Sequence, residues 1–335
     1  RSQGAGGDRH MSAPPERIDD AAVLGSGVMG HGIALAFALD GHAVSLYDVN
    51  EDLLDESEDR VRSVLDTLVS AGEVDPDEAD AAADRITRTT SLPDAVAGAD
   101  FVTEAVVEDL DIKREVFADL DDHAEDDAIL ATNTSGLSIT AIADATDDPE
   151  RVVGTHWFNP PYVVPLVEVI RGEETADDVI DTTYEFFDAM GKTPVHVEKD
   201  IPGFIGNRIQ MAMIYEAFSL LDRGVASAEA IDRAVKAGFG FRLPLLGIFE
   251  KVDHSGLDVE HEVEQYLLPE LDRGTESKDV LSEAVENGDY GLKTGKGVYD
   301  WEGLDPGEIY DQRDEALLAI LDLYDSLDME RTPRT

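Results

Sequence analysis

The sequence predicts an α/β protein: a doubly wound parallel sheet, followed by a smaller all-helical C-terminal domain. Three observations favour this fold class. Short apolar segments alternate with helical segments between residues 20 and 200, as in parallel sheets whose strands are joined by helices. A glycine-rich turn follows the first apolar segment. Beyond residue 200 the short apolar segments fade and helical periodicity remains.

The composition indicates a folded protein with an acidic surface. The chain has 335 residues, of which 42% are hydrophobic, enough for a core and for two domains. The 26 Lys and Arg residues against 74 Asp and Glu residues give a net charge of −48. Because the apolar residues are strongly periodic, we interpret this charge as the coat of a halophile's protein, whose self-repulsion salt screens. Such a coat disfavours nucleic acid and anionic membranes as partners.

The remaining compositional features exclude several classes. No cysteine is present, which excludes disulfides and thiolate chemistry. No apolar run is long enough for a membrane span, and no secretory signal precedes the first strand. We read residues 1–19 as a disordered leader because they are polar and rich in Gly and Pro. We therefore expect a cytoplasmic protein, and we expect no metal site.

Residues 20–200 form the predicted sheet domain. Its first strand runs into the glycine turn and a helix that ends at Gly41, a residue suited to a helix C-terminus. Further strands and helices then alternate along the chain. The expected strands are 21–24, 43–47, 86–89, 101–106, 128–132, 152–156, 166–170 and 194–198, and the expected helices include the segment ending at 39, 51–70, a short one from 76, 113–120 and 177–190.

Residues 201–335 form the predicted helical domain, for substrate binding and dimerisation. Apolar residues recur at helical spacing from 205 to 221, and Gly224 stops that helix. Ser227 is placed to cap the next helix, which ends at Gly238. More helix is expected at 259–268 and 277–286, and the acidic segment 305–327 reads as a docked helix.

The glycine turn is the first functional signal. Gly25, Gly27 and Gly30 follow a strand and open a helix. The first allows the tight turn, the second lets the backbone approach a pyrophosphate, and the third lets helix and strand pack closely. Together with Val28 and Met29, which lie between the last two glycines, they place the N-terminus of the helix where a phosphate group binds. This arrangement is typical of the Rossmann-type dinucleotide site.

Asp48 indicates which dinucleotide binds. It ends the second strand, where an acidic side chain grips the ribose 2′-hydroxyl. Val49 and Asn50 follow, so no arginine is adjacent to hold a 2′-phosphate. The pattern therefore favours NAD over NADP, although Asp48 is also one of many surface aspartates in this chain.

The stretch THWFNPPYVVPLVEVI, residues 155–170, is the second signal. His156 falls at the end of one strand and Glu168 lies in the next, inside an apolar run. Histidine is the commonest general base, and a buried carboxylate is costly unless it is paired. If the strands are neighbours, Glu168 can orient the ring of His156 and stabilise its charged form. On spacing alone, a purely structural pair remains the alternative.

Six stretches of the chain together carry a family resemblance, although each is only modestly specific alone. They cover about residues 21–301 and read VLGSGVMGHGIA, FVTEAVVEDLDIKREVFADL, ATNTSGLSI, GTHWFNPPYVVPLVEVI, IPGFIGNRI and GLKTGKGVYDW. In this order they resemble the L-3-hydroxyacyl-CoA dehydrogenase family, which includes 3-hydroxybutyryl-CoA dehydrogenases. The resemblance implies a nucleotide-binding domain, a helical dimerisation domain and NAD-dependent oxidation of (S)-3-hydroxyacyl-CoA to 3-ketoacyl-CoA by a homodimer.

The resemblance assigns roles to individual residues. It implies that His156 is the catalytic histidine and Glu168 its partner, with Ser135 and Asn207 holding the substrate oxygens. Read without it, Ser135 would be a helix cap and Asn207 a solvated amide. The residues implied on the cofactor side, beyond the glycine turn and Asp48, are Glu108, Lys113, Asn133, Asn159 and Lys293.

Two alternatives stay open. The first is a dehydrogenase of a free hydroxy acid, as in the L-gulonate or carnitine branches of the same fold. The second is a non-catalytic NAD-binding protein. The segment 241–258 lacks the Gly-Pro pair that many family members carry there, which leaves the acyl chain length open. Arg60 and Arg62 could meet coenzyme A phosphates, but ordinary solvated charges are the better reading.

Overall fold

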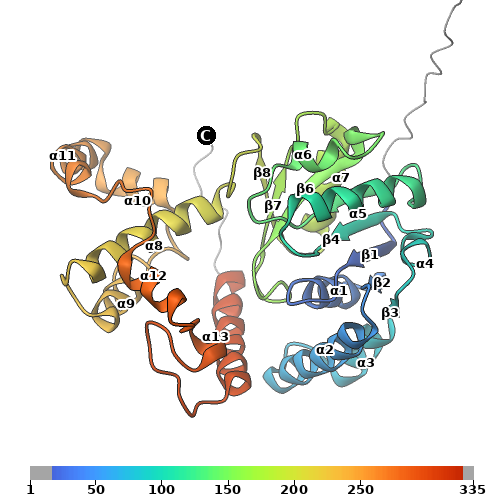
Figure 1. Cartoon of the computed structure of the whole chain (residues 1–335), viewed down its shortest axis with the longest axis horizontal. Helices are drawn as coiled ribbons and strands as arrows, with labels where there is room; N and C mark the ends of the chain where they lie inside the picture. Colours follow the sequence, from blue (N-terminus) through green and yellow to red (C-terminus); the bar gives the residue numbers. More distant parts are fainter. Residues whose placement is uncertain (1–16, 327–335) are drawn as a thin grey trace, which may run out of the picture. The chain divides into compact units, whose positions relative to one another are not determined.

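The computed structural model describes residues 17–326, which divide into two compact units, 17–207 and 208–326 (Figure 1). Most of the expected leader lies outside the described residues. Ile18 is described and buried in the core, so ordered chain begins before the expected end of that leader.

The first unit is built on an eight-stranded sheet in the order β3-β2-β1-β4-β5-β6-β7-β8. The chain runs outward from β1 to β3 and then returns to β1's other side with β4, which creates a switch point between β1 and β4. Ligands of doubly wound sheets bind at such a point, beyond the carboxyl ends of the strands. The strands are β1 Asp20–Leu24, β2 Ala43–Tyr47, β3 Ile86–Thr89, β4 Phe101–Glu104, β5 Ile129–Thr132, β6 Val152–Trp157, β7 Leu166–Ile170 and β8 Thr193–Val197.

Helices cover both faces of this sheet, and a separate hydrophobic core lies between the sheet and the helices of each face. Side chains from α1, α2, α3 and α7 pack on one face, and those from α4, α5 and α6 pack on the other. The predicted fold class is therefore confirmed for this unit. The helices are α1 Gly30–Leu39, α2 Glu51–Ala71, α3 Pro76–Asp84, α4 Leu92–Val96, α5 Leu110–His123, α6 Ile139–Ala143, the short 3₁₀ helix η1 Pro149–Arg151, and α7 Asp177–Ala189.

One strand pair departs from the predicted parallel arrangement. β6 and β7 are antiparallel, whereas every other neighbouring pair is parallel. The connection between them, residues 158–165, holds three prolines and is too short for the crossover that parallel strands require. As a result His156 and Glu168 are direct partners in the strand register.

Local sequence explains where several helices begin and end. The Asn50 side chain accepts a hydrogen bond from Asp52 N–H at the start of α2, which ends at Gly72 in the left-handed conformation. Asp109 caps α5 through the N–H groups of Asp111 and Ile112. These side chains satisfy backbone donors that the first helical turn leaves without partners.

The second unit is helical in its described part, residues 208–326. It carries most of α8, and Ser227 caps α9 as expected, by accepting from Ala230 N–H. α10, η2 and η3 were not expected from the sequence. The elements are α8 Gly206–Asp222, α9 Ala228–Ala237, α10 Ile248–Ser255, α11 Leu257–Leu267, η2 Leu268–Glu270, α12 Asp279–Glu286, η3 Leu292–Thr294 and α13 Pro306–Ser326.

Candidate active site

The glycine turn lies between β1 and α1 and needs two of its glycines for steric reasons. Gly25 has φ +96°, and a Cβ there would lie 2.7 Å from the Ala105 carbonyl oxygen that follows β4. A Cβ on Gly30 would lie 1.6 Å from the Gly25 carbonyl oxygen. At Gly27, in contrast, a Cβ would meet no atom within 4 Å. Gly27 therefore keeps open the space in front of the α1 N-terminus, as a bound pyrophosphate requires.

Asp48 joins the end of β2 to this turn. Its Oδ2 accepts hydrogen bonds from Ser26 N–H and the Ser26 hydroxyl, each at 2.9 Å, and its Oδ1 accepts from Asn50 N–H at 3.1 Å. Asp48 is only 9% exposed. Of the two residues between Gly27 and Gly30, Val28 is exposed and Met29 is partly buried. An acid held at this edge of the turn fits a nucleoside ribose.

His156 and Glu168 form a buried pair across β6 and β7. His156 Nδ1 lies 2.6 Å from Glu168 Oε2, and the Asn207 amide nitrogen lies 3.3 Å from His156 Nε2. Because that amide nitrogen can only donate, we assign the proton of the neutral ring to Nδ1, from which it is donated to Glu168. The Nε2 atom is then left with a lone pair, as a general base needs.

The other oxygen of Glu168 holds the start of α8. Oε1 accepts from Ile205 N–H at 2.9 Å and Gly206 N–H at 2.8 Å. Burial disfavours the charged carboxylate, but the hydrogen bonds from His156 and from these two N–H groups outweigh it and lower the pKa of Glu168. Glu168 is therefore held as an anion beside the histidine.

Two aromatic side chains that sequence reasoning did not single out surround the histidine ring. The ring centroids of Phe158 and Phe204 lie 4.6 and 5.7 Å from that of His156. Phe204 has φ +47°, a conformation rare outside glycine, and it is buried. Gly206 lets Phe158 approach, since a Cβ there would lie 2.5 Å from Phe158 Cζ. Phe158 lies in the stretch GTHWFNPPYVVPLVEVI and Phe204 in IPGFIGNRI, and this position in the two stretches was the sequence signal that could have identified them.

Asn207 brings the Ser135 loop to the histidine. Its amide nitrogen lies within hydrogen-bond distance of both the Ser135 carbonyl oxygen, at 3.1 Å, and His156 Nε2. Ser135 is exposed, and it does not cap α6, because Ser138 does so by accepting from Ala141 N–H. The four residues predicted as catalytic thus lie together, and Ser135 and Asn207 bring polar groups to the edge of the site.

Glu108 and Lys113 belong to a charged network at the end of β4. Lys113 is fully buried and lies 2.7 Å from Glu104 and 3.5 Å from Glu108. Glu104 also accepts from the Thr132 hydroxyl at 2.7 Å. Glu108 in turn accepts from Ser135 N–H at 2.8 Å. The sequence alone did not identify Glu104. The available signal was one acidic residue at the end of an apolar strand, in a chain with many acidic residues.

The remaining predicted cofactor residues differ in their surroundings. Asn133 accepts a hydrogen bond from Trp157 N–H at 3.0 Å, next to His156. Asn159 is exposed and follows β6 by two residues. Lys293 belongs to the second unit, where its ammonium lies 5.2 Å from the Tyr290 ring centroid. Asn133 and Asn159 thus flank the histidine strand.

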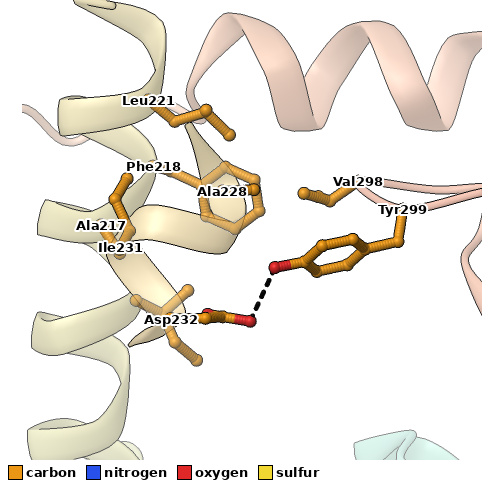
Figure 2. A pocket seen from close by; sticks show the side chains of 9 residues that line it. Ala217, Phe218, Leu221, Ala228, Ile231, Asp232, Val298 and Tyr299 are labelled. Carbon is orange, nitrogen blue, oxygen red and sulfur yellow. Dashed lines mark hydrogen bonds between the residues drawn. The ribbon is translucent and has the colours of Figure 1, made fainter. Parts of the chain in front are cut away.

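The second unit contains an apolar pocket of its own (Figure 2). Phe218 and Leu221 of α8, Ile231 of α9, and Val298 contribute to its wall. The Tyr299 hydroxyl donates to Asp232 at 2.8 Å at its polar side. Within residues 17–326, no helix is long and apolar enough to cross a membrane, and no cluster of three or more His, Asp or Glu side chains is arranged to hold a metal ion.

Two family models together match most of the chain. The first, described as the 3-hydroxyacyl-CoA dehydrogenase NAD binding domain, matches residues 20–201. The second, described as the 3-hydroxyacyl-CoA dehydrogenase C-terminal domain, matches residues 203–301.

Individual proteins show the same similarity. The chain is 38% identical to 3-hydroxybutyryl-CoA dehydrogenase of Clostridioides difficile, over 84% of this chain and 98% of the relative. It is 33% identical to 5-formyl-3-hydroxy-2-methylpyridine 4-carboxylate 5-dehydrogenase of Mesorhizobium japonicum, over 90% and 97%. A crystal structure of a 5-dehydrogenase for that pyridine acid, described as an NAD+-dependent dismutase, superposes with a TM-score of 0.87 at 31% identity, covering 93% of this chain and all of the other.

Proposed function

Because the chain belongs to the 3-hydroxyacyl-CoA dehydrogenase family and takes NAD as its cofactor, we propose that it interconverts (S)-3-hydroxyacyl-CoA and 3-ketoacyl-CoA. The observation that carries this proposal is the buried His156–Glu168 pair, whose Nε2 atom is left as an acceptor beside Asn207. When bound, NAD supplies the hydride acceptor.

The residues of the chain divide the remaining work. Nε2 of His156 takes the proton of the 3-hydroxyl group in the oxidation direction and returns it in the reverse direction. The Glu168 carboxylate stabilises the imidazolium that forms. Asn207 and Ser135 hold the substrate oxygens, and the two phenylalanines beside the ring exclude water from it.

The glycine turn, Asp48 and the Glu108–Lys113 network form the proposed cofactor side. The turn offers backbone N–H groups to the pyrophosphate, and Asp48 offers an acceptor to the ribose. Asn133 and Asn159 flank the histidine strand on the proposed nicotinamide side. The cofactor role of Lys293 stays a prediction from the family resemblance. We assign residues 20–200 to NAD binding and residues 201–335 to substrate binding and dimerisation.

The direct test is the acetoacetyl-CoA-dependent oxidation of NADH. The wild-type protein is expected to turn over, and His156→Ala is expected to lower kcat by about 10²–10⁴-fold, the contribution of a positioned acid or base. His123→Ala is the matched control, because His123 is exposed at the end of α5. Equal turnover by His156→Ala and wild type would remove the histidine from the mechanism.

A second candidate is a dehydrogenase of a substrate that carries a free carboxylate rather than coenzyme A. The Mesorhizobium relative, whose name is that of a pyridine carboxylate dehydrogenase, favours this reading. The ion pairs of Arg60 and Arg62 also favour it. Arg60 is paired with Glu56 and Arg62 with Glu58, each one helical turn away, rather than left for coenzyme A phosphates. A panel of acetoacetyl-CoA, acetoacetate and the pyridine aldehyde separates the two, since only one class should give a high kcat/KM. NAD binding without turnover of any of them would leave the non-catalytic alternative.

We also propose a homodimer. Few side chains in the described part of the second unit are buried, and large apolar ones are exposed, including Phe241 at 74% and Phe249 at 85%. Apolar surface of this extent is typical of protein interfaces. Sedimentation equilibrium should give twice the chain mass, and Phe249→Asp should shift it toward the monomer. A wild-type monomer at micromolar concentration would contradict the proposal.

A further inference from the structure

The loop between β6 and β7, residues 158–165, connects the strands that carry His156 and Glu168. Because the two residues are direct partners in an antiparallel register, the position of this loop affects how the two side chains meet. The loop also carries Asn159. None of the proposed chemistry uses the side chains that hold the loop in place.

Lys192 holds this loop from one side. Its Nζ donates to the Pro161 carbonyl oxygen at 2.7 Å and to that of Val164 at 3.4 Å. It also lies 5.4 Å from the centroid of the Trp157 ring, a favourable distance for a cation over an aromatic face. The next residue, Thr193, donates its N–H to the Pro165 carbonyl oxygen at 2.8 Å. The start of β8 is therefore bonded to the loop at three points.

Helix α1 contacts the same loop from another element. A Cβ on Gly32 would lie 2.7 Å from Pro161 Cγ and 3.0 Å from its Cδ, so the proline ring rests directly on the helix. Gly30, in the first turn of α1, packs against the Gly25 carbonyl oxygen of the glycine turn. Pro161 is thus held between the helix that serves the cofactor and the ammonium of Lys192, which links the two halves of the site.

Lys192 is partly buried, and taking a lysine ammonium out of water costs free energy unless it is paired. The chain has only eight lysines, and this one is placed against two carbonyl oxygens and an indole. Charge-assisted hydrogen bonds are about twice as strong as neutral ones. Burial lowers the pKa of Lys192 to about 8, and no charged side chain of the described residues contributes to that shift.

We propose that Lys192 is a positioning residue, which fixes the 158–165 loop so that His156 stays aligned with the bound cofactor and substrate. The inference rests on the proposed function. Hydride and proton transfer require reacting atoms about 3–3.5 Å apart, and a displacement of about 1 Å can cost about 10²-fold in rate. Of the proposed cofactor residues only Asn159 belongs to the loop, whereas the glycine turn is built from β1 and α1, so loosening the loop should lower turnover more than NAD affinity.

The test compares Lys192→Met, Lys192→Arg and Lys199→Met, the last being an exposed lysine just beyond β8. Lys192→Met is expected to lower kcat about ten- to a hundredfold, within the range for small misplacements, while KM for NAD changes less than about threefold. Lys192→Arg should recover most of kcat, and Lys199→Met should match wild type. A Lys192→Met protein with wild-type kcat and a lower melting temperature would overturn the proposal in favour of a structural role.

A pH profile and a second variant test the same proposal independently. Wild-type kcat should fall as pH rises through about 8, because the ammonium loses its proton, and Lys192→Arg should lack that fall. An identical alkaline fall in both proteins would count against the proposal. If Lys192→Met does not fold, Gly32→Ala, which pushes on Pro161 from α1, should lower kcat in its place. Wild-type turnover is measured first, with whichever substrate of the panel is active, so that failure of the proposed function is seen separately.

Discussion

His156 Nδ1 lies 2.6 Å from Glu168 Oε2, and the second oxygen of that carboxylate accepts two backbone N–H groups at the start of α8. One carboxylate therefore orients the histidine ring and anchors the residues just before Asn207. The base and the amide beside its Nε2 atom are positioned by the same side chain. Because β6 and β7 are antiparallel, this arrangement needs only a short loop between them.

We expect Glu168→Gln to fold and to bind NAD but to lose turnover. The amide oxygen can still accept the proton of Nδ1, but the imidazolium then lacks a counter-ion. The amide NH2 cannot accept from the Ile205 and Gly206 N–H groups, so the variant should also be less stable than wild type. The expected loss in kcat is about 10²–10⁴-fold, with KM for NAD nearly unchanged. Steady-state kinetics in both directions measure it. A variant with more than about half of the wild-type kcat would show that the charge of Glu168 is not needed.

The same substitution has a pH signature in stability. The folded state lowers the pKa of Glu168 below its ordinary value of 4.5, so its contribution is present above that value. It is lost as pH falls from 4.5 through the folded pKa, because the unfolded chain binds the proton first. The difference in unfolding free energy between wild type and Glu168→Gln should therefore shrink as pH is lowered through this window. Denaturant titrations at a series of pH values test it, and a constant difference would contradict the lowered pKa.

The buried Glu104–Lys113 pair gives a separate prediction. Glu104→Gln removes the negative charge 2.7 Å from the fully buried ammonium of Lys113 and leaves it the carboxylate of Glu108 at 3.5 Å, which should destabilise the protein by about 3–5 kcal/mol. The double variant Glu104→Gln with Lys113→Met should regain much of this loss, because no buried charge is left unpaired. Urea unfolding of the single and double variants measures the coupling. Additive effects of the two substitutions would mean that the pair does not interact.

Gly27 and Gly30 should respond differently to the same added methyl group. Gly30→Ala forces a Cβ against the Gly25 carbonyl oxygen, so it should destabilise the fold by about 1–3 kcal/mol or more. Gly27→Ala meets no protein atom and should leave the melting temperature unchanged, yet weaken NAD binding about tenfold, or about 1.4 kcal/mol. Calorimetry of unfolding and of NAD binding separates the two effects. Undiminished NAD affinity in Gly27→Ala would place the pyrophosphate elsewhere.

Some of these residues were readable from the sequence and others were not, for physical reasons. Gly25, Gly30 and Asp48 are defined by their spacing to one strand and helix, so a local pattern finds them. Lys192 contacts the Pro161 carbonyl across 31 positions of sequence, and a carbonyl leaves no mark in the amino-acid letters. The antiparallel pairing of β6 and β7 was missed for a different reason: strand patterns do not show direction, and the available signal was the short connection 158–165, because parallel strands need a longer crossover.

The acidic surface predicts that stability depends on salt. A net charge of −48 makes the compact state repel itself, and salt screens that repulsion over a Debye length of about 3 Å at 1 M. We expect the melting temperature to rise from dilute buffer to about 2–3 M KCl, with partial unfolding at the low end. Exposed pairs such as Arg62–Glu58 contribute little and weaken with salt, so they cannot reverse the trend. Thermal unfolding followed by circular dichroism across KCl concentrations tests this, with sucrose at matched osmolality as the control for a general solute effect. Equal melting temperatures in dilute buffer and in concentrated KCl would show that the coat serves solubility alone.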